Sequence, residues 1–302
     1  MRFDRLDLNL LVAFDVLAKE QNVSAAARTL NLSQSAVSGA LNRLRDYFGD
    51  ELLVPSGRRM ILTPKALLLV EPVRQALLTI RSTITTPAKF DPATADRRFV
   101  IVASDYAYNV FLADALKVAG HEAPGASFDV MPPDVGAFRR LESGEVDLLL
   151  TIENYMVREH PHELLCVDDH AVVAWDQNPY CLKGLDKALF GRLGHVITFF
   201  GPERFPAFSE SQFEEMGIQR NIDVRVSTFA AIPQSVIGTE RIATMHRRHA
   251  EYFARIMPIR IFDMPYTLPE IRECMQWHRI RQADEGLKWL ADHIKTASKV
   301  LM

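Results

Sequence analysis

The chain has 302 residues, of which 48% are hydrophobic and 24% charged, and its formal net charge is −3. These values are ordinary for a soluble globular protein of two or three domains and exclude a generally basic nucleic-acid coat protein. The N-terminus has no apolar signal segment, and no apolar run is long enough to span a membrane. The three cysteines are scattered and odd in number, so we expect a cytoplasmic protein.

The N-terminal region predicts three helices. The first covers residues 8–17, has Leu8, Leu11, Val12, Phe14 and Leu17 on its apolar face, and is capped by Asp7 or Asn9. Ser24 is suited to cap a second helix that ends at Leu30, and Ser33 a third that begins at Gln34. The buried stripe predicted for the third helix is Val37, Leu41 and Leu44.

The other face of the third helix is polar and cationic. Its residues are Gln34, Ser35, Ser38, Asn42, Arg43 and Arg45. Small polar and cationic side chains can bond base edges or phosphates in a major groove, and no acid lies between Glu20 and Asp46. The pattern predicts a helix-turn-helix whose last helix reads DNA. The alternative is an ordinary helical hairpin with a solvated polar face.

A β-hairpin is predicted directly after these helices. Residues 52–54 and 60–62 form its two short strands, and Arg58 and Arg59 lie near its tip. Arginines there are suited to phosphates or the minor groove, so we interpret the hairpin as a DNA-contacting wing. The alternative is a solvated turn whose charges are incidental.

A long helix is predicted to begin at Thr63-Pro64, with Thr63 as its cap. Apolar residues alternate at spacings of four and three along it: Ala66, Val70, Val73, Leu77, Ile80 and Ile84. Such a seam favours pairing with a second helix, and therefore a dimer. The alternative is a helix packed on its own domain.

Strands and helices alternate beyond residue 92. Strands are expected at 98–103, 127–131, 146–152, 195–200, 224–227 and 241–245, and helices after the first, second, fourth and fifth of these. Further extended segments are expected at 164–175, 259–262 and 271–277, and a final helix at 284–297. The alternation predicts a mostly parallel α/β architecture in two lobes with a cleft between them.

The chain resembles the LysR-type transcriptional regulators over its whole length. The resemblance is carried by Asp7-Leu8-Asn9-Leu10-Leu11, Ala25-Ala26-Ala27, Leu32-Ser33-Gln34-Ser35-Ala36-Val37-Ser38, Leu44-Arg45, and Gly57-Arg58-Arg59-Met60-Ile61-Leu62-Thr63-Pro64. Leu268-Pro269-Glu270-Ile271 and Trp277-His278 are similar to the branch that contains nodulation regulators and regulators of aromatic and chloroaromatic degradation.

The resemblance implies an N-terminal winged helix-turn-helix (1–62), a linker and dimerisation helix (63–92), and an α/β inducer-binding domain (93–302) like periplasmic binding proteins. Lobe 1 would comprise about 93–166 and 268–302, and lobe 2 about 167–267. It also implies a homodimer or homotetramer on promoter DNA that contacts RNA polymerase. The predicted DNA-binding residues are Ser24, Ser33, Gln34, Ser35, Ser38, Asn42, Arg43, Arg45, Arg58 and Arg59.

Ligands of two-lobed folds bind where strand ends face the cleft. The candidates at strand ends are Ser104, Asp105, Tyr106, Asn154, Phe200, Thr228 and Phe229. His170 and Arg248 match positions that contact the inducer's polar groups in the aromatic-responsive branch, and the segment 246–249 is expected to be a loop. Each candidate has a structural alternative: Ser104 and Thr228 as helix caps, Phe200 and His170 as core residues, and Arg248 in a surface ion pair.

These residues predict a transcriptional regulator whose inducer is a phenol, chlorinated phenol or aromatic carboxylate. A flavonoid or non-aromatic inducer is an alternative, and a solute-binding protein is less favoured. No nucleophile, metalloprotease or phosphate-loop motif is found, so we expect no enzyme and no cofactor. His160, His162 and Cys166 have metal-ligand chemistry but lack a second pair, so we expect no metal site.

Overall fold

The computed structural model describes residues 6–57, 59–80, 84, 89–201 and 203–299. The chain divides into two units, residues 1–86 and 87–302. Among the described helices, none has the length and apolar character needed to cross a membrane.

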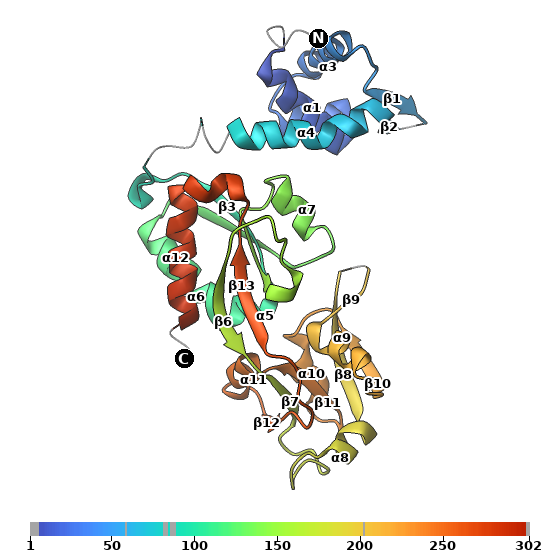
Figure 1. The fold of residues 1–302 in the computed structure, drawn as a ribbon, viewed down its shortest axis with the longest axis vertical. Helices are drawn as coiled ribbons and strands as arrows, with labels where there is room; N and C mark the ends of the chain where they lie inside the picture. Colours follow the sequence, from blue (N-terminus) through green and yellow to red (C-terminus); the bar gives the residue numbers. More distant parts are fainter. Residues whose placement is uncertain (1–5, 58, 81–83, 85–88, 202, 300–302) are drawn as a thin grey trace. The chain divides into compact units, whose positions relative to one another are not determined.

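The N-terminal unit is a helical domain with one hairpin (Figure 1). Its elements are α1 (Leu8–Glu20), α2 (Val23–Thr29), α3 (Gln34–Phe48), β1 (Leu53–Ser56), β2 (Arg59–Leu62) and α4 (Pro64–Ile80). The two strands are antiparallel, with Leu53 opposite Leu62. Phe14, Leu17 and Leu44 are fully buried and form the centre of a core shared by the helices and the hairpin.

Side-chain caps set where these helices begin. Asp7, Ser33 and Thr63 each accept a hydrogen bond from a backbone N–H in the first turn of α1, α3 and α4, as predicted. The prediction for Ser24 is wrong, because Asn22 caps α2 and accepts the Ala25 N–H at 2.9 Å. Asparagine at position 22 already satisfies the helix end, so the helix begins one residue before Ser24.

The apolar seam of α4 packs largely against the core of its own unit. Ala66, Val73 and Leu77 are buried in the same core as α1, which supports the alternative of a helix packed on its own domain. The exposed apolar side chains of α4 are instead Leu67 and Leu68, which are 60% and 78% exposed.

The C-terminal unit contains two mixed sheets. In lobe 1 the strand order is β4 (Ser127–Met131), β3 (Arg98–Val102), β5 (Leu148–Ile152), β13 (Ile271–Gln276) and β6 (His162–Asp168). In lobe 2 it is β10 (Asn221–Val226), β8 (Gly194–Phe200), β11 (Ile242–His246), β7 (His170–Trp175) and β12 (Ile259–Asp263), with β9 (Phe205–Pro206) on β8. In each sheet the first three strands are parallel and the other two join antiparallel, so the expectation of mostly parallel sheets holds for only part of each.

Helices flank both sheets. They are η3 (Pro92–Thr94), α5 (Asp105–Ala107), η4 (Tyr108–Leu112), α6 (Ala113–Glu122), α7 (Ala137–Glu142), η5 (Glu153–Tyr155), α8 (Lys187–Arg192), α9 (Phe208–Glu215), α10 (Ala231–Val236), α11 (Arg247–Ala254), η6 (Arg279–Ala283) and α12 (Glu285–Lys299). α6 and α12 pack side by side (Figure 1). The loop expected at 246–249 is wrong, because α11 begins at Arg247 and buries His249, Ala250 and Phe253 on one face.

The chain passes between the lobes twice. Asp169 separates β6 from β7, and residues 264–270 connect β12 to β13. The long extended segment expected at 164–175 is therefore two strands, one in each sheet.

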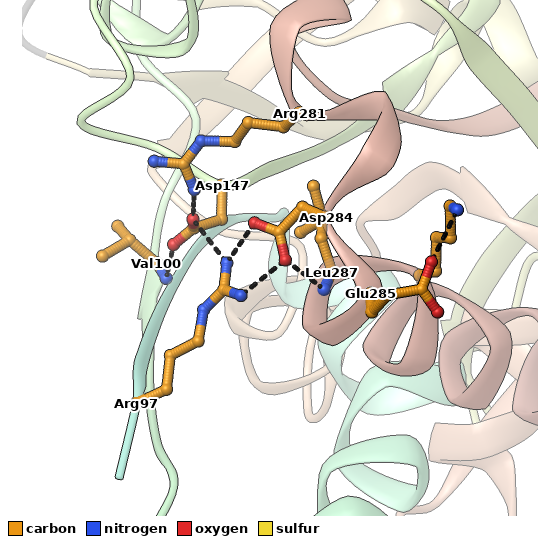
Figure 2. Close-up of polar contacts among 8 residues, drawn as sticks. Arg97, Val100, Asp147, Arg281, Asp284, Glu285 and Leu287 are labelled. Atoms are coloured by element: carbon orange, nitrogen blue, oxygen red, sulfur yellow. Dashed lines mark hydrogen bonds and ion pairs between the residues drawn. The ribbon is translucent and has the colours of Figure 1, made fainter. Parts of the chain in front are cut away.

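A cluster of paired charges lies where β3 and β5 begin (Figure 2). Arg97 donates two hydrogen bonds to the Asp284 carboxylate, at 2.6 and 2.8 Å. Asp147 accepts a hydrogen bond from the Val100 N–H at 2.7 Å and forms an ion pair with Arg281. This cluster joins the start of the lobe 1 sheet to α12, at the end of the sheet opposite the strand ends expected to bind ligand.

Candidate functional site

The polar face of α3 is accessible. Gln34, Ser35, Asn42 and Arg43 are exposed, and Ser38 is half-buried. The Ser24 hydroxyl donates to Gln34 Oε1 at 3.1 Å, which links α2 to the first turn of α3. Arg43 is 63% exposed, and among the described residues its one ion-pair partner is Asp7, with 3.7 Å between Nη1 and Oδ2. These side chains can reach a DNA groove without breaking the fold.

Arg45 differs from its neighbours on this face. Its Nε donates to the carbonyl of Glu51 and its Nη2 to the carbonyl of Leu53, both at 2.8 Å. The guanidinium therefore fixes the approach to the hairpin, which gives Arg45 a positioning role. Of the two hairpin arginines, Arg58 lies outside the described residues, and only the backbone of Arg59 is described, at the start of β2.

A cavity of about 350 Å³ lies between the lobes of the C-terminal unit. Aromatic side chains form much of its wall: Phe138, Tyr155, Phe200, Phe205, Phe208 and Phe229. The aliphatic lining is Pro133, Val135, Ala137, Leu149, Leu150, Ile152 and Pro206. The other lining residues are Ser104, Asp134, Thr151, His246 and Glu273. Such a cavity suits a flat, largely apolar ligand.

Three of the nine predicted inducer residues line this cavity: Ser104, Phe200 and Phe229. Ser104 also caps α5 by accepting the Ala107 N–H at 3.2 Å. The Phe200 and Phe229 rings meet edge to face with centroids 5.3 Å apart, so they form one corner of the wall.

The other six predicted residues do not line this cavity. Asn154 and Thr228 are exposed. Asp105 accepts the Ala230 N–H at 2.5 Å, so its carboxylate joins lobe 1 to the start of α10 in lobe 2. Tyr106 is fully buried, donates to Asp168 at 2.9 Å and stacks on His246 with centroids 4.0 Å apart.

His170 and Arg248 are also directed elsewhere. The His170 ring lies against Phe208, itself a cavity residue, with centroids 6.0 Å apart. Burial lowers the pKa of His170 to about 4, so it is neutral at physiological pH. The Arg248 guanidinium donates to the carbonyl of Val167 at 3.1 Å. Neither side chain is placed to contact a ligand in the cavity.

Sequence reasoning missed Glu273, which together with His246 forms the polar floor of the cavity. Glu273 and His246 are both buried, at 2% and 7% exposure. Burial, reinforced by the charge of Asp168, raises the pKa of Glu273 to about 8, and burial lowers that of His246 well below its usual value. A carboxyl between Ile271 and Cys274–Met275 in the extended segment expected at 271–277 was the available signal, since a carboxyl is unfavourable in a core unless it has a partner.

In the described part of the chain, no three His, Cys, Asp or Glu side chains are grouped as metal ligands. His160 packs against His278 with ring centroids 4.5 Å apart, whereas His162 and Cys166 belong to β6. All three cysteines are buried thiols.

Comparisons with known proteins agree with both halves of this description. Residues 8–67 match the model of the bacterial regulatory helix-turn-helix protein of the lysR family, and residues 93–299 match the LysR substrate binding domain. The chain is 41% identical over 290 residues to nodulation protein D 1 of Rhizobium tropici, covering 96% of this chain and 94% of the relative.

Solved structures show the same fold. A full-length OxyR variant from Pseudomonas aeruginosa matches with a TM-score of 0.75 at 17% identity, covering 97% of this chain and 96% of that one. Full-length CbnR in complex with its target DNA matches with a TM-score of 0.51 at 17% identity, covering 97% and 100%. The family models describe transcriptional regulators rather than enzymes.

Proposed function

This chain belongs to the LysR family of bacterial transcriptional regulators, and we propose that it controls transcription in response to a small aromatic inducer. The observation that carries the proposal is the cavity between the lobes, whose apolar wall includes six Phe and Tyr rings. Aromatic rings favour edge-to-face and offset contacts with a flat aromatic ligand. The inducer would bind there and shift the balance between two arrangements of the lobes.

The contacts between the lobes suggest how binding would be transmitted. Ser104 lines the cavity, and the next residue, Asp105, accepts a hydrogen bond from Ala230 in the other lobe. Asn109 contacts His249 across the same boundary at 3.1 Å. A ligand that moves either lobe would change these bonds, and so stabilise one arrangement over the other.

On the DNA side, the exposed face of α3 would read an interrupted palindrome in promoter DNA, as part of a homodimer or homotetramer that contacts RNA polymerase in the cytoplasm. The exposed leucines of α4 support an oligomer, since apolar side chains of this size favour a partner. The test is a titration of a duplex that the protein selects from a random pool. We expect affinity to fall steeply with salt, and an affinity independent of salt would contradict the proposal.

The inducer class is tested separately, by thermal unfolding of the full chain with phenols, aromatic carboxylates and flavonoids. A bound compound raises the unfolding midpoint by mass action. Thr151→Phe places a ring in the cavity from the end of β5 and should abolish the effect of every active compound. A compound that stabilises both proteins equally binds elsewhere, and a non-aromatic metabolite as the sole stabilising class would contradict the aromatic assignment.

A further inference from the structure

The cavity contains one buried carboxyl that the fold leaves without a hydrogen bond. Glu273 lies on β13, between Ile152 of β5 and Cys166 of β6, and it lines the cavity. No hydrogen bond reaches its carboxyl from the residues that the structure describes. A buried carboxyl without a partner is unfavourable, so a ligand that bonds to it removes a penalty that the free protein carries.

The described lining of the cavity contains no cationic side chain. Among the described residues that line it, none is a lysine or arginine, and Asp134 is a second carboxyl. Asp134 is already paired with Arg140, at 2.9 and 3.1 Å. An aromatic carboxylate would therefore bring its charge into an apolar space without a cation to receive it.

His246 provides a second polar contact on the floor of the cavity. Its ring stacks on Tyr106, and its Nδ1 is buried with no hydrogen-bond partner in the described part of the chain. Because burial keeps this imidazole neutral, one ring nitrogen is an acceptor. A ligand hydroxyl could donate to it.

We propose that Glu273 is a specificity-determining residue of the inducer cavity, where its protonated carboxyl donates a hydrogen bond to an oxygen of an uncharged aromatic ligand. This inference rests on the proposed function and narrows it, because phenols, ethers and ketones fit such a donor and aromatic carboxylates do not. With a pKa of about 8, Glu273 holds its proton at neutral pH and loses it in mild alkali.

The groups around Glu273 are consistent with this protonation state. The titratable groups that face it are Asp168 and Cys166 of β6, Tyr106 of α5, and Cys274 beside it on β13. The nearby cation, Arg248, is bonded to the carbonyl of Val167 and contacts Asp168 through its backbone N–H. Asp168 therefore disfavours a second negative charge at Glu273.

The test uses the full chain and three naphthalene derivatives: 2-naphthol, 2-naphthoate and 2-methoxynaphthalene. At about pH 6.5 we expect calorimetry to show 2-naphthol binding at least about tenfold more tightly than 2-naphthoate. The ether does not titrate, so its affinity reports the protein alone. Between about pH 6.5 and pH 9 that affinity should fall about tenfold, because only about a tenth of Glu273 keeps its proton one unit above its pKa.

Glu273→Gln keeps an uncharged donor of the same shape and should remove the pH response to the ether. Glu270→Gln is the matched control, because Glu270 is an exposed carboxylate on the adjoining segment, and it should keep the response. Equal affinity for 2-naphthol and 2-naphthoate, or an unchanged pH response in Glu273→Gln, overturns this inference alone. If none of the three compounds binds the wild-type chain, the aromatic cavity of the proposed function is overturned with it.

Discussion

The two ends of the lobe 1 sheet both bury carboxyl groups, and Glu273 at one end contrasts with the arginine-paired carboxylates at the other. Where β3 and β5 begin, Arg97 and Asp284 form a bidentate pair beside Asp147 and Arg281 (Figure 2). Where β5 ends and β13 begins, Glu273 is buried and receives no hydrogen bond from the described residues. A buried carboxylate paired with arginine stabilises the fold, whereas the proposal assigns the buried, protonated carboxyl at the cavity to a ligand.

The same difference appears in the two carboxyl pKa values. Burial tends to raise the pKa of Asp284, but hydrogen bonds from Arg97 and its charge lower it overall. At Glu273 burial meets no such opposition and raises the pKa to about 8. The two carboxyls should therefore give the stability of the unit opposite dependences on pH.

Asp284→Ala should have the largest effect on stability. Asp284 accepts two hydrogen bonds from Arg97 and a third from the Leu287 N–H at 3.0 Å, so its loss removes the bidentate partner of the half-buried guanidinium and the acceptor at the start of α12. We expect the free energy of unfolding to fall by about 3 kcal/mol. All three tryptophans, Trp175, Trp277 and Trp289, lie in the C-terminal unit, so their fluorescence in urea measures this unit.

The control for this substitution is the next residue. Glu285 is exposed and pairs with Lys288 at 2.9 Å, also visible in Figure 2. Exposed ion pairs contribute little, so Glu285→Ala should change the free energy of unfolding by less than about 0.5 kcal/mol. If both variants lost similar amounts of stability, the buried pair of Asp284 with Arg97 would contribute no more to folding than an exposed ion pair.

Glu273→Gln should act in the opposite direction. The folded protein keeps the proton on Glu273 up to about pH 8, whereas an unfolded glutamate releases it near its ordinary pKa of about 4.3. The folded state thus binds more protons in this window, and the stability of the wild type falls as pH rises through it. Glu273→Gln removes the cost of keeping this carboxyl protonated in the folded state, so it should stabilise the C-terminal unit by about 1–3 kcal/mol at neutral pH.

The pH profile separates the two carboxyls. The Asp284 pKa is lowered by folding, so its stabilisation is present above the unfolded value and is lost as pH falls through the folded one. We therefore expect urea unfolding across the acid and neutral range to show two trends in the free energy of unfolding. The loss of stability in Asp284→Ala, relative to wild type, should disappear in acid. The gain of stability in Glu273→Gln should grow towards neutral pH. A Glu273→Gln variant no more stable than wild type would mean that Glu273 has a partner in the protein.

The sequence predicted the edge of the cavity better than its floor. The strand-end rule selected Ser104, Phe200 and Phe229, and these three residues line the cavity, because the ends of neighbouring strands face the same cleft. The same rule failed for Asn154 and Thr228, since it does not say which side chain turns inward. Glu273 was missed because its contribution depends on how β13 enters the sheet antiparallel to β5.

Periodicity had a similar limit in the N-terminal unit. The seam of α4 predicted burial correctly for Ala66, Val73 and Leu77, but a spacing does not say which surface covers it. The caps of α1, α3 and α4 were predictable because each is a local contact within three residues. The orientations of His170 and Arg248 depend on long-range packing, which the sequence does not reveal. The His170 ring contacts Phe208, and the Arg248 guanidinium donates to the carbonyl of Val167.

The distinction between paired and unpaired charges extends to α3. Arg45 donates to the backbone carbonyls of Glu51 and Leu53, and its Nε also lies 3.1 Å from the Glu51 carboxylate. Its side chain is 27% exposed. We expect Arg45→Ala to destabilise the N-terminal unit by about 1–2 kcal/mol, because carbonyls at the start of the hairpin lose their donor. Far-UV circular dichroism during thermal unfolding measures this loss, and an unchanged melting profile would contradict the positioning role.

Arg43 is the opposite case and should give the smallest change in stability. Its side chain is 63% exposed and its ion pair with Asp7 is long, at 3.7 Å, so Arg43→Ala should alter the free energy of unfolding by less than about 0.5 kcal/mol. If its charge is reserved for DNA, the variant should bind the selected duplex more weakly and with a salt slope reduced by about one. Fluorescence anisotropy at several salt concentrations measures both quantities. A slope equal to that of the wild type would place Arg43 away from the phosphates, and the exposure of a cation on α3 would then be no guide to its function.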